Sequence, residues 1–397
     1  MCAPAEEADV IIVNTCGFIA PAKDESIQAV LELARHKESG RCRKLLVIGC
    51  LAQRYACELR ALLPEADGVF GLGEEDAIVA ACGLRATGTR DVGRLLLTLP
   101  HTAYLRISDG CDNRCAYCVI PAIRGPYRSR PAAEVLREAR ALVAAGVREL
   151  NVIGQDTTRY GADLPRGPRI HELLAELAAI PKLRWLRLLY THPAHFTDEL
   201  IEAYATIPVL CPYVDLPVQH LNDEVLRRMG RKVTQREILD LIARLRKRVP
   251  GVAIRTTCIV GFPGETQAQF EELLALVRQI GFDHLGAFAY SREEGTRAAR
   301  MRGQIPERVK AERLRRLMLL QREVVRRKQR VLRGMEVEVV IDRRAHQQQV
   351  WVARSRTQAP DVDGVTYVRG AGLRPGQFIR VVITGARGYD ILARPVR

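Results

Sequence analysis

The chain of 397 residues lacks any long hydrophobic run, and no apolar stretch approaches the roughly 20 residues that a membrane-spanning helix needs. Its first residues include Glu6, Glu7 and Asp9 and lack the charged-then-apolar pattern of a secretory signal. Internal repeats of fixed period and low-complexity tracts are also absent, and 47% hydrophobic residues are enough for ordinary cores. We therefore expect a soluble, cytoplasmic protein of two or three domains with no membrane segment.

Acidic residues are scarce relative to basic ones. The chain has 46 Asp and Glu against 61 Lys and Arg, a formal net charge of +15 at pH 7. Such an excess favours a polyanionic neighbour, of which RNA or a ribosome is the obvious candidate. The alternative is a general enrichment in arginine, since nearly all of the excess is Arg. Composition leaves both interpretations open.

The cysteines do not form the disulfide framework of a short secreted protein, because they are odd in number, eleven, and scattered over a long chain. In a reducing cytosol, clustered cysteines indicate a metal site instead. Solitary cysteines are usually small buried hydrophobes. We expect no more than such packing from Cys42, Cys57, Cys82, Cys211 and Cys258.

Strand-like and helix-like segments alternate over most of the chain, which is typical of α/β folds with parallel strands. Residues 1–99 are predicted to form a small doubly wound N-terminal domain. Its predicted strands are 10–13, 45–48 and 68–70, and its predicted helices include 24–36 and 51–63.

Residues 100–303 are predicted to form a partial (β/α)6 barrel. Its predicted strands are 103–107, 150–153, 186–190, 213–216, 253–260 and 284–290, and the predicted helices between them include 132–145, 170–180, 234–248 and 267–280. In such barrels the chemistry lies at the carboxyl ends of the strands. Each barrel motif described below falls at such an end.

Two further segments complete the chain. Residues 304–333 predict one long basic helix, with eleven Lys or Arg and three Glu, a net charge of +8. Such a helix can contact RNA, although a solvated connector is more common. From residue 334 the periodicity becomes alternating, with short strands predicted at 335–341, 350–353, 364–368, 378–383 and 390–393. Residues 334–397 therefore predict a small all-β barrel of OB-like size.

Three cysteines follow the first barrel strand in the sequence Cys111-Asp-Asn-Arg-Cys115-Ala-Tyr-Cys118, a C-x3-C-x2-C spacing. Three thiolates in so short a loop can hold three irons of a [4Fe–4S] cluster and leave the fourth iron open. The alternative is a structural zinc site, which normally has four closed ligands. The next cysteine is Cys211 and the nearest preceding histidine is His101, so no fourth ligand lies nearby. The spacing favours the cluster.

With the aromatic Tyr117 just before its third cysteine, this motif resembles that of the radical S-adenosylmethionine superfamily. The open iron would chelate S-adenosylmethionine through its amino and carboxylate groups. The resemblance implies reductive cleavage of this cofactor to a 5′-deoxyadenosyl radical, which removes hydrogen from an unactivated carbon. Such chemistry belongs to the cofactors, while the protein supplies position and excludes water.

Two other stretches of the barrel agree with this resemblance. Gly261-Phe-Pro263-Gly264-Glu follows the fifth strand, where glycines let a backbone approach a ligand closely, and resembles the adenosine-binding stretch of the superfamily. By itself it would be no more than a turn. Gln155 and Asp156 end the second strand and resemble the polar residues that hold the methionyl end or the ribose of the cofactor.

The N-terminal region resembles that of the methylthiotransferases, in which cysteines at strand ends hold a second [4Fe–4S] cluster. The resemblance is carried by Asn14-Thr-Cys16-Gly-Phe and Gly49-Cys50-Leu-Ala-Gln-Arg. Cys16 and Cys50 each follow a predicted strand, so both can point into one site. A pair of strand-end cysteines alone would favour core packing; the resemblance implies ligation.

The C-terminal barrel resembles the TRAM domain of the same family, which binds substrate, through the stretch from Ile383 to Asp390. Four stretches, 118–131, 155–161, 213–220 and 290–296, resemble the RimO type. That type methylthiolates an aspartate of small-subunit ribosomal protein twelve, so the implied partner is this protein or the assembling small ribosomal subunit. RNA contact through the basic helix and the TRAM domain is a further expectation. The resemblance identifies neither the sulfur donor nor the electron donor.

The implied mechanism uses two molecules of S-adenosylmethionine. One methylates sulfur bound at the Cys16/Cys50 cluster, and the other yields the radical that removes hydrogen from the aspartate β-carbon, to which the methylthio group is then joined. A tRNA methylthiotransferase of the MiaB type is the alternative, and it carries different residues after the second barrel strand. A catalytically impaired iron–sulfur protein that binds RNA is a third hypothesis.

One departure from the family pattern supports that third hypothesis. Family members begin with another strand and another cysteine, the first of three N-terminal ligands, and this sequence starts after that point. Cys2 is a poor replacement, because a strand of about six residues, roughly 20 Å long, separates it from Cys16. We therefore expect either a start codon placed too far downstream or an incomplete second cluster.

Overall fold

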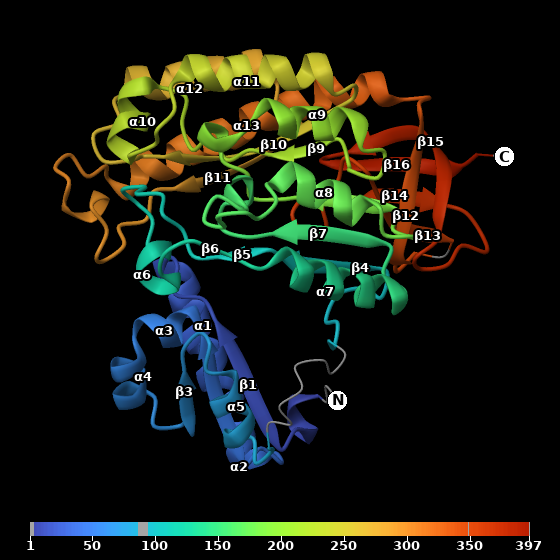
Figure 1. Ribbon diagram of the computed structural model, residues 1–397. Coiled ribbons are helices and arrows are strands. Elements are labelled where there is room, and N and C mark those ends of the chain that lie inside the picture. The colour runs from blue at the N-terminus through green and yellow to red at the C-terminus, as the bar shows by residue number, and fades with distance from the viewer. Residues whose placement is uncertain (1–3, 86–93, 348, 397) are drawn as a thin grey trace. The chain divides into compact units, whose positions relative to one another are not determined.

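The computed structural model describes residues 4–85, 94–347 and 349–396. The chain divides into two compact units (Figure 1). The first comprises Met1–Arg94, Gly110–Pro126 and Ser291–Arg300, and the second comprises Leu95–Asp109, Tyr127–Tyr290 and Met301–Arg397. The division into domains at residues 99, 303 and 333 stays a prediction.

The first unit contains a three-stranded parallel sheet in the order β1-β2-β3. Its strands are β1 (Val10–Thr15), β2 (Lys44–Gly49) and β3 (Gly68–Phe70), and its helices are α1 (Ala20–Ala34), α2 (His36–Ser39), α3 (Cys50–Arg54), α4 (Ala56–Leu62) and α5 (Glu75–Ala81). Buried and exposed side chains alternate along β1 because one face of the sheet packs on helices. Val13, Val30 and Val47 form part of this core. The α/β character predicted for this region is confirmed.

The single helix predicted at residues 51–63 is two helices in the structure. The break is at Tyr55, whose backbone leaves the helical region with φ −133° and ψ 38°. The Tyr55 ring packs beneath two cations, with Lys23 Nζ 5.5 Å and the Arg54 guanidinium 4.9 Å from its centre. Cys50 is the first residue of α3, so the second sheet strand runs directly into the helix that carries this cysteine.

Two other segments belong to this unit. The loop that carries the three clustered cysteines leads into the short helix α6 (Ile120–Arg124), and Ser291–Arg300 ends in a 3-10 turn at Ala298–Arg300. The helices α3 and α6 pack against each other. The first unit therefore contains all five cysteines that the sequence suggests as iron ligands.

The second unit contains the predicted partial barrel of six parallel strands. These are β4 (Thr102–Arg106), β7 (Glu149–Ile153) and β8 (Trp185–Leu188) in one sheet, and β9 (Tyr213–Asp215), β10 (Ala253–Val260) and β11 (His284–Ala289) in the other. A bridge between Leu186 and Leu210 lies between the two sheets. A short antiparallel pair, β5 (Ser108–Asp109) with β6 (Arg128–Ser129), follows the first strand.

Helices cover the outer face of these strands (Figure 1). They are α7 (Ala132–Ala144), α8 (Ile170–Ala178), α9 (Asp198–Thr206), α10 (Asp223–Met229), α11 (Gln235–Arg248) and α12 (Gln267–Ile280). The bounds of α12 follow from local chemistry: Thr266 and Gln269 form a capping box at its start, and Gly281 ends it with a left-handed φ of 62°. Phe270 and Val277 on its inner face are buried in the barrel core.

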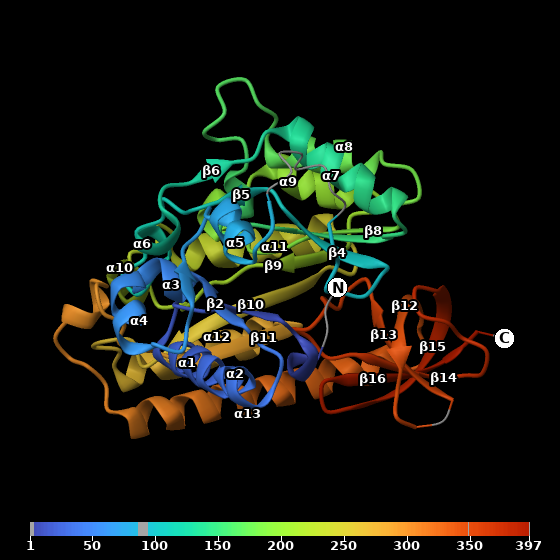
Figure 2. The same ribbon diagram turned by 90° about the horizontal axis from the view of Figure 1, so that it is seen from below.

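The basic segment forms one helix, α13 (Glu307–Leu332), which packs on α12 and β11. It leads into a closed five-stranded barrel in the order β12-β13-β14-β16-β15 (Figure 2). Its strands are β12 (Glu336–Arg344), β13 (Val350–Ser355), β14 (Thr366–Arg369), β15 (Phe378–Arg387) and β16 (Asp390–Pro395). The predicted all-β C-terminal domain is confirmed.

Buried charges join this closed barrel to the partial barrel within the second unit. Arg354 on β13 donates to both oxygens of Glu149 on β7, at 3.0 and 2.8 Å, and to both oxygens of Asp342 on β12, at 2.7 and 3.0 Å. Arg187 on β8 lies 3.3 Å from Glu149, and both of these side chains are fully buried. The Nε2 atom of His101 lies 2.9 Å from Asp342. The two barrels of this unit are thus held together by ionic contacts away from water.

Among the helices of the described ranges, none combines the length and the apolar character that crossing a membrane requires.

Candidate functional site

The loop of the three clustered cysteines is closed by backbone hydrogen bonds. The amide of Cys111 donates to the carbonyl of Gly125 at 3.1 Å, and the amide of Cys118 donates to that of Cys115 at 3.2 Å. Gly110, just before the first cysteine, has φ 75°, and a β-carbon there would overlap the carbonyl oxygen of Pro126. Glycine is therefore required where the chain enters the loop.

All three cysteines line one cavity of about 500 Å³ in the first unit. Cys111 is buried, while Cys115 and Cys118 are half-buried. Residues 295–297 of the segment Ser291–Arg300 line the same cavity, and no fourth Cys or His occurs among the described residues of its lining. Three soft ligands without a fourth do not suit a closed zinc site. They do suit a cluster with one open iron, so the residues present fit the [4Fe–4S] group.

The N-terminal cysteines lie at neighbouring strand ends. Cys16 follows β1 and is exposed, and Cys50 follows β2 and is half-buried. The chain is tightly packed between them: a β-carbon on Gly17 would lie 2.8 Å from the carbonyl oxygen of Cys50. The two loops can approach so closely only because residue 17 is glycine. Cys2, the remaining candidate ligand, lies outside the described residues.

Arg124, which ends α6, is not among the site residues predicted from the sequence. Its Nη2 atom donates to the sulfur of Cys50 at 3.4 Å. Thiolate is the form of cysteine that binds metal, and Arg124 places a cation beside this sulfur. Arg124 lies inside the stretch 118–131 that resembles the RimO type, but that resemblance does not link it to Cys50.

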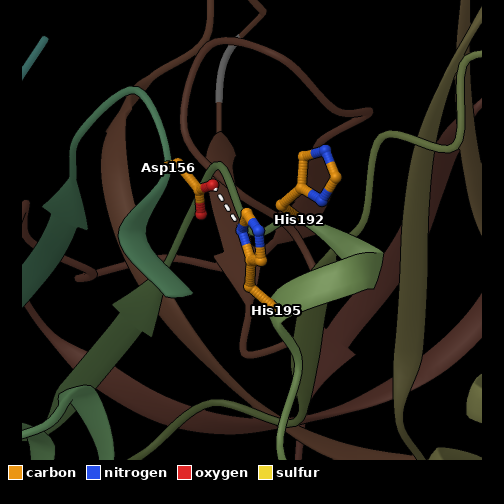
Figure 3. A group of neighbouring side chains, drawn as sticks. All are labelled: Asp156, His192 and His195. Atoms are coloured by element: carbon orange, nitrogen blue, oxygen red, sulfur yellow. Dashed lines mark hydrogen bonds and ion pairs between the residues drawn. The ribbon is translucent and has the colours of Figure 1, made fainter. Parts of the chain in front are cut away.

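In the second unit, Gln155 and Asp156 follow β7 as expected. The Oε1 atom of Gln155 is buried and has no hydrogen-bond partner among the described residues. Asp156 has both oxygens engaged: Thr158 Oγ1 lies 2.5 Å from one, and His195 Nδ1 lies 2.8 Å from the other (Figure 3). Of these two side chains, Gln155 therefore has a buried acceptor still available to a ligand.

Two histidines join Asp156 in a group that was not predicted. The ring of His192 stacks on that of His195, with centres 4.7 Å apart, and the ligand atoms of the three residues lie within 4.8 Å of one another (Figure 3). Both histidines follow β8, the next strand of the sheet, around the short 3-10 turn Pro193–His195. Their placement after a barrel strand is the sequence signal that could have identified them.

The protonation of this group follows from burial and nearby charge. Burial by itself would raise the pKa of Asp156, but the hydrogen bond and charge of His195 outweigh it, and the pKa lies below its ordinary value. Burial, together with Arg231, lowers the pKa of His192 to about 3. At neutral pH, His192 is therefore an uncharged ring beside a carboxylate–imidazole pair, an arrangement that can accept and donate hydrogen bonds to a polar ligand.

The stretch from Gly261 to Glu265 forms a tight loop after β10. One Glu265 oxygen accepts from the amides of Gly261 and Phe262, at 2.5 and 3.0 Å. Burial raises the pKa of Glu265, although Arg313, 3.3 Å from its other oxygen, and the two amides oppose the rise. The Cα faces of Gly261 and Gly264 are covered by the side chains of Lys310 and Arg228.

Tyr117, the remaining candidate, is half-buried between Cys115 and Cys118. The structure thus divides the predicted site residues into two sets. Tyr117 and the five cysteines lie in the first unit, and Gln155, Asp156 and the 261–264 loop lie in the second.

Comparison with known families defines the class of protein. Residues 105–277 match the radical SAM superfamily, residues 334–396 match the TRAM domain, and residues 1–71 match the uncharacterized protein family UPF0004. The fold agrees: the radical S-adenosylmethionine methyltransferase TsrM from Kitasatospora setae superposes with a TM-score of 0.52 at 17% identity, covering 71% of this chain and 62% of that chain. The chain is a radical S-adenosylmethionine enzyme with a TRAM domain, and its cofactors are a [4Fe–4S] cluster and S-adenosylmethionine.

Curated relatives narrow the class to a family. A ribosomal protein uS12 methylthiotransferase RimO from Desulforudis audaxviator is 51% identical, covering 98% of this chain and 89% of that protein. Proteins of the same name from Geobacter sulfurreducens and Symbiobacterium thermophilum are 46% and 47% identical, covering 97% and 98% of this chain and 90% and 83% of those proteins. The chain belongs to the RimO family of methylthiotransferases.

Proposed function

We propose that this enzyme transfers a methylthio group to the β-carbon of an aspartate in ribosomal protein uS12. The observation that carries the proposal is the similarity to RimO proteins over nearly the whole chain, at 45–51% identity. The substrate is the isolated ribosomal protein or the assembling small subunit, and the site of action is therefore the cytoplasm.

In this proposal Cys111, Cys115 and Cys118 hold the cluster that binds S-adenosylmethionine. When bound, the [4Fe–4S] cluster and S-adenosylmethionine together supply a carbon radical able to remove hydrogen from an unactivated carbon. The cavity beside the three cysteines supports the assignment, because its lining leaves no fourth thiol or imidazole among the described residues to close the site. Cys16 and Cys50 are proposed ligands of the second cluster, whose third ligand is not assigned.

The chain's own residues then orient the cofactor and exclude water. We assign this role to Tyr117, Gln155, Asp156 and the loop from Gly261 through Pro263 to Gly264. Support for Gln155 comes from its buried, unpartnered oxygen. Asp156 contributes indirectly, because both of its oxygens already accept hydrogen bonds and one of them holds His195. Gly261 and Gly264 allow a turn whose amides are organised by a buried carboxylate, and Pro263 stiffens that turn.

RNA contact through the TRAM domain and α13 completes the proposal. A cavity of about 850 Å³ in the closed barrel is lined by four arginines, Arg343, Arg369, Arg387 and Arg394, and by Tyr367. Guanidinium groups and an aromatic ring in one cavity suit phosphates and stacked bases. Ribosomal RNA beside uS12 would present both, which explains a basic enzyme acting on a ribosomal partner.

The test is mass spectrometry of uS12 from a strain in which the gene is deleted and then restored. We expect the aspartate of uS12 to lose its methylthio group in the deletion strain and to regain it with the restored gene. Transfer RNA from the same cells is analysed in parallel. A loss of methylthio groups from tRNA with uS12 unchanged would contradict the proposal and favour a tRNA methylthiotransferase.

A further inference from the structure

The segment Ser291–Arg300 contacts both groups of cysteine-bearing loops in the first unit. One end of the segment binds the N-terminal sheet domain that carries Cys16 and Cys50. The other end binds the loop that carries Cys111, Cys115 and Cys118. The segment also lines the cavity of the three clustered cysteines.

Glu293 is the centre of the first set of contacts. One of its oxygens accepts from the backbone amide of Ala20, the first residue of α1, at 2.7 Å, and from the hydroxyl of Ser291 at 2.6 Å. Its other oxygen lies 3.1 Å from Lys23 Nζ and 3.8 Å from Arg54 Nη1. The Glu293 side chain is only 2% exposed, so these contacts act with little screening by water.

The pKa of Glu293 agrees with an ionised side chain. Burial would raise it, but the hydrogen bonds from Ser291 and Ala20 and the charge of Lys23 outweigh burial and hold it below its ordinary value. A carboxylate at the start of α1 also opposes the positive end of the helix dipole. The negative charge therefore stabilises the attachment of α1 to the segment.

Arg54 extends this attachment to both N-terminal cysteines. It ends α3, whose first residue is Cys50. Its Nη1 atom donates to the carbonyl of Gly17, next to Cys16, at 2.9 Å, and its Nη2 atom donates to the carbonyl of Glu294 at 2.6 Å. One guanidinium thus links the helix of Cys50, the loop of Cys16 and the segment.

The far end of the segment is held by the loop of the clustered cysteines. Arg297 Nη2 donates to the carbonyl of Arg114, and the amide of Ala298 donates to the carbonyl of Ala116, both at 2.9 Å. These carbonyls lie on either side of Cys115. Between the two ends, Thr296 Oγ1 donates to the carbonyl of Glu293 at 2.7 Å, which makes the connection a compact turn.

We infer that Glu293 is a positioning residue that sets the separation between the Cys16/Cys50 pair and the three clustered cysteines. The inference rests on the proposed function. In that function the methylthio group held at the Cys16/Cys50 pair must reach the substrate carbon that is activated at the three clustered cysteines. The short turn joins the two sets of cysteines, which are also joined by the packing of α3 on α6 and by the hydrogen bond from Arg124 to the sulfur of Cys50. A displacement of about 1 Å between reacting groups can reduce a rate roughly 100-fold.

The test compares Glu293→Ala and Glu293→Gln with Glu294→Ala as the matched control. Glu294 is the adjacent residue with the same side chain, but it is exposed and takes part in the turn only through its carbonyl. We expect Glu293→Ala to cleave S-adenosylmethionine within about twofold of the parent rate and to lose roughly 100-fold in methylthio transfer. Glu293→Gln, which can still accept from Ala20, is expected to fall between Glu293→Ala and the control.

A second measurement uses the metal-free protein and needs no activity. Hydrogen exchange of the amides at residues 17–23 and 50–54 is expected to be about tenfold faster in Glu293→Ala than in Glu294→Ala. The tenfold difference is the protection that is lost with one hydrogen bond to a charged group. Exchange at these amides equal to the control would overturn the inference. An equal loss of S-adenosylmethionine cleavage and of methylthio transfer in Glu293→Ala would also overturn the inference, since it indicates general unfolding.

The two proposals fail separately. If the parent enzyme transfers no methylthio group to uS12, the proposed function fails, whereas the exchange experiment still decides whether Glu293 holds the two cysteine sets together.

Discussion

Replacing Arg354 with Met tests how much the buried charges contribute to holding the closed barrel on the partial barrel. Arg354 is the shared partner of Glu149 and Asp342, and its removal leaves the fully buried Glu149 with Arg187 at 3.3 Å and the hydroxyl of Thr102 at 2.8 Å. Removing one partner of a buried ion pair destabilises a protein by about 3–5 kcal/mol. Total stabilities are about 5–15 kcal/mol. We therefore expect Arg354→Met to lose about a fifth of the free energy of unfolding or more.

The matched control is the double variant Glu149→Gln with Arg354→Met, which removes one charge of each sign. Because the two side chains contact each other, their effects should not add, and we expect the double variant to be more stable than the sum of the single variants by about 0.5–3 kcal/mol. The assay is urea unfolding followed by tryptophan fluorescence. The chain has two tryptophans: Trp185 on β8 packs against Phe378 on β15, where the two barrels meet, and Trp351 lies on β13 of the closed barrel.

Two results would refute this reasoning. One is an Arg354→Met variant whose free energy of unfolding at pH 7 lies within about 1 kcal/mol of the parent value. That result would mean that water or rearrangement compensates the carboxylates that have lost Arg354. The other is strict additivity in the double variant, which would show that Glu149 and Arg354 stabilise the protein independently of each other.

Acid should weaken the same network. Burial would raise the pKa of Glu149, but Arg354 and Arg187 hold it at about 2 in the folded protein, against 4.5 for an ordinary glutamate. Because the folded pKa is depressed, the stabilisation is present above pH 4.5 and is lost as the pH falls through 4.5 toward 2. The loss amounts to about 3 kcal/mol. Glu149→Gln should lack this part of the acid dependence, and a parent-like acid transition in that variant would contradict the assignment.

Four further predictions concern the sites. Cys115→Ala should abolish formation of 5′-deoxyadenosine under reduction while leaving the metal-free protein folded; continued formation would refute the cluster assignment. Asp156→Asn should loosen His195 and reduce methylthio transfer roughly tenfold or more, as measured by mass spectrometry, with the iron content unchanged. Deleting residues 334–397 should destabilise the remaining barrel, because Glu149 loses Arg354; an unchanged unfolding midpoint for Trp185 would contradict this. Arg387→Glu should weaken RNA binding and lower its salt dependence in a filter-binding assay, whereas an unchanged slope would place the RNA elsewhere.

Much of the fold could be predicted from the sequence because its signals are local. The helix at residues 267–280 has the same bounds in the structure, since a capping box and Gly281 mark its ends. The bounds of helix α9, Asp198–Thr206, were not predicted, although Thr197 caps it. The break at Tyr55 was missed because hydrophobic periodicity does not register a single residue whose backbone leaves the helical region.

The candidate site was predictable to a different extent. Cys111, Cys115 and Cys118 are close in sequence, and their spacing alone indicates a metal site. Arg124 could not be linked to Cys50 in this way, because 74 residues separate them. The histidines beside Asp156 were missed for the same reason, since His195 is 39 positions after Asp156. Side chains that meet only in the folded chain leave no pattern of spacing.

The pairing of Glu149 with Arg354 spans 205 residues, and this has a consequence for biosynthesis. A ribosome adds about 5–20 residues per second, so Glu149 leaves the tunnel roughly 10–40 s before its partner. During that interval β7 and β8 carry Glu149 and Arg187 without the guanidinium that completes the network. The partial barrel therefore reaches its final stability only when translation is nearly finished, and a chain that stops before residue 354 is left with the barrel most exposed to proteases.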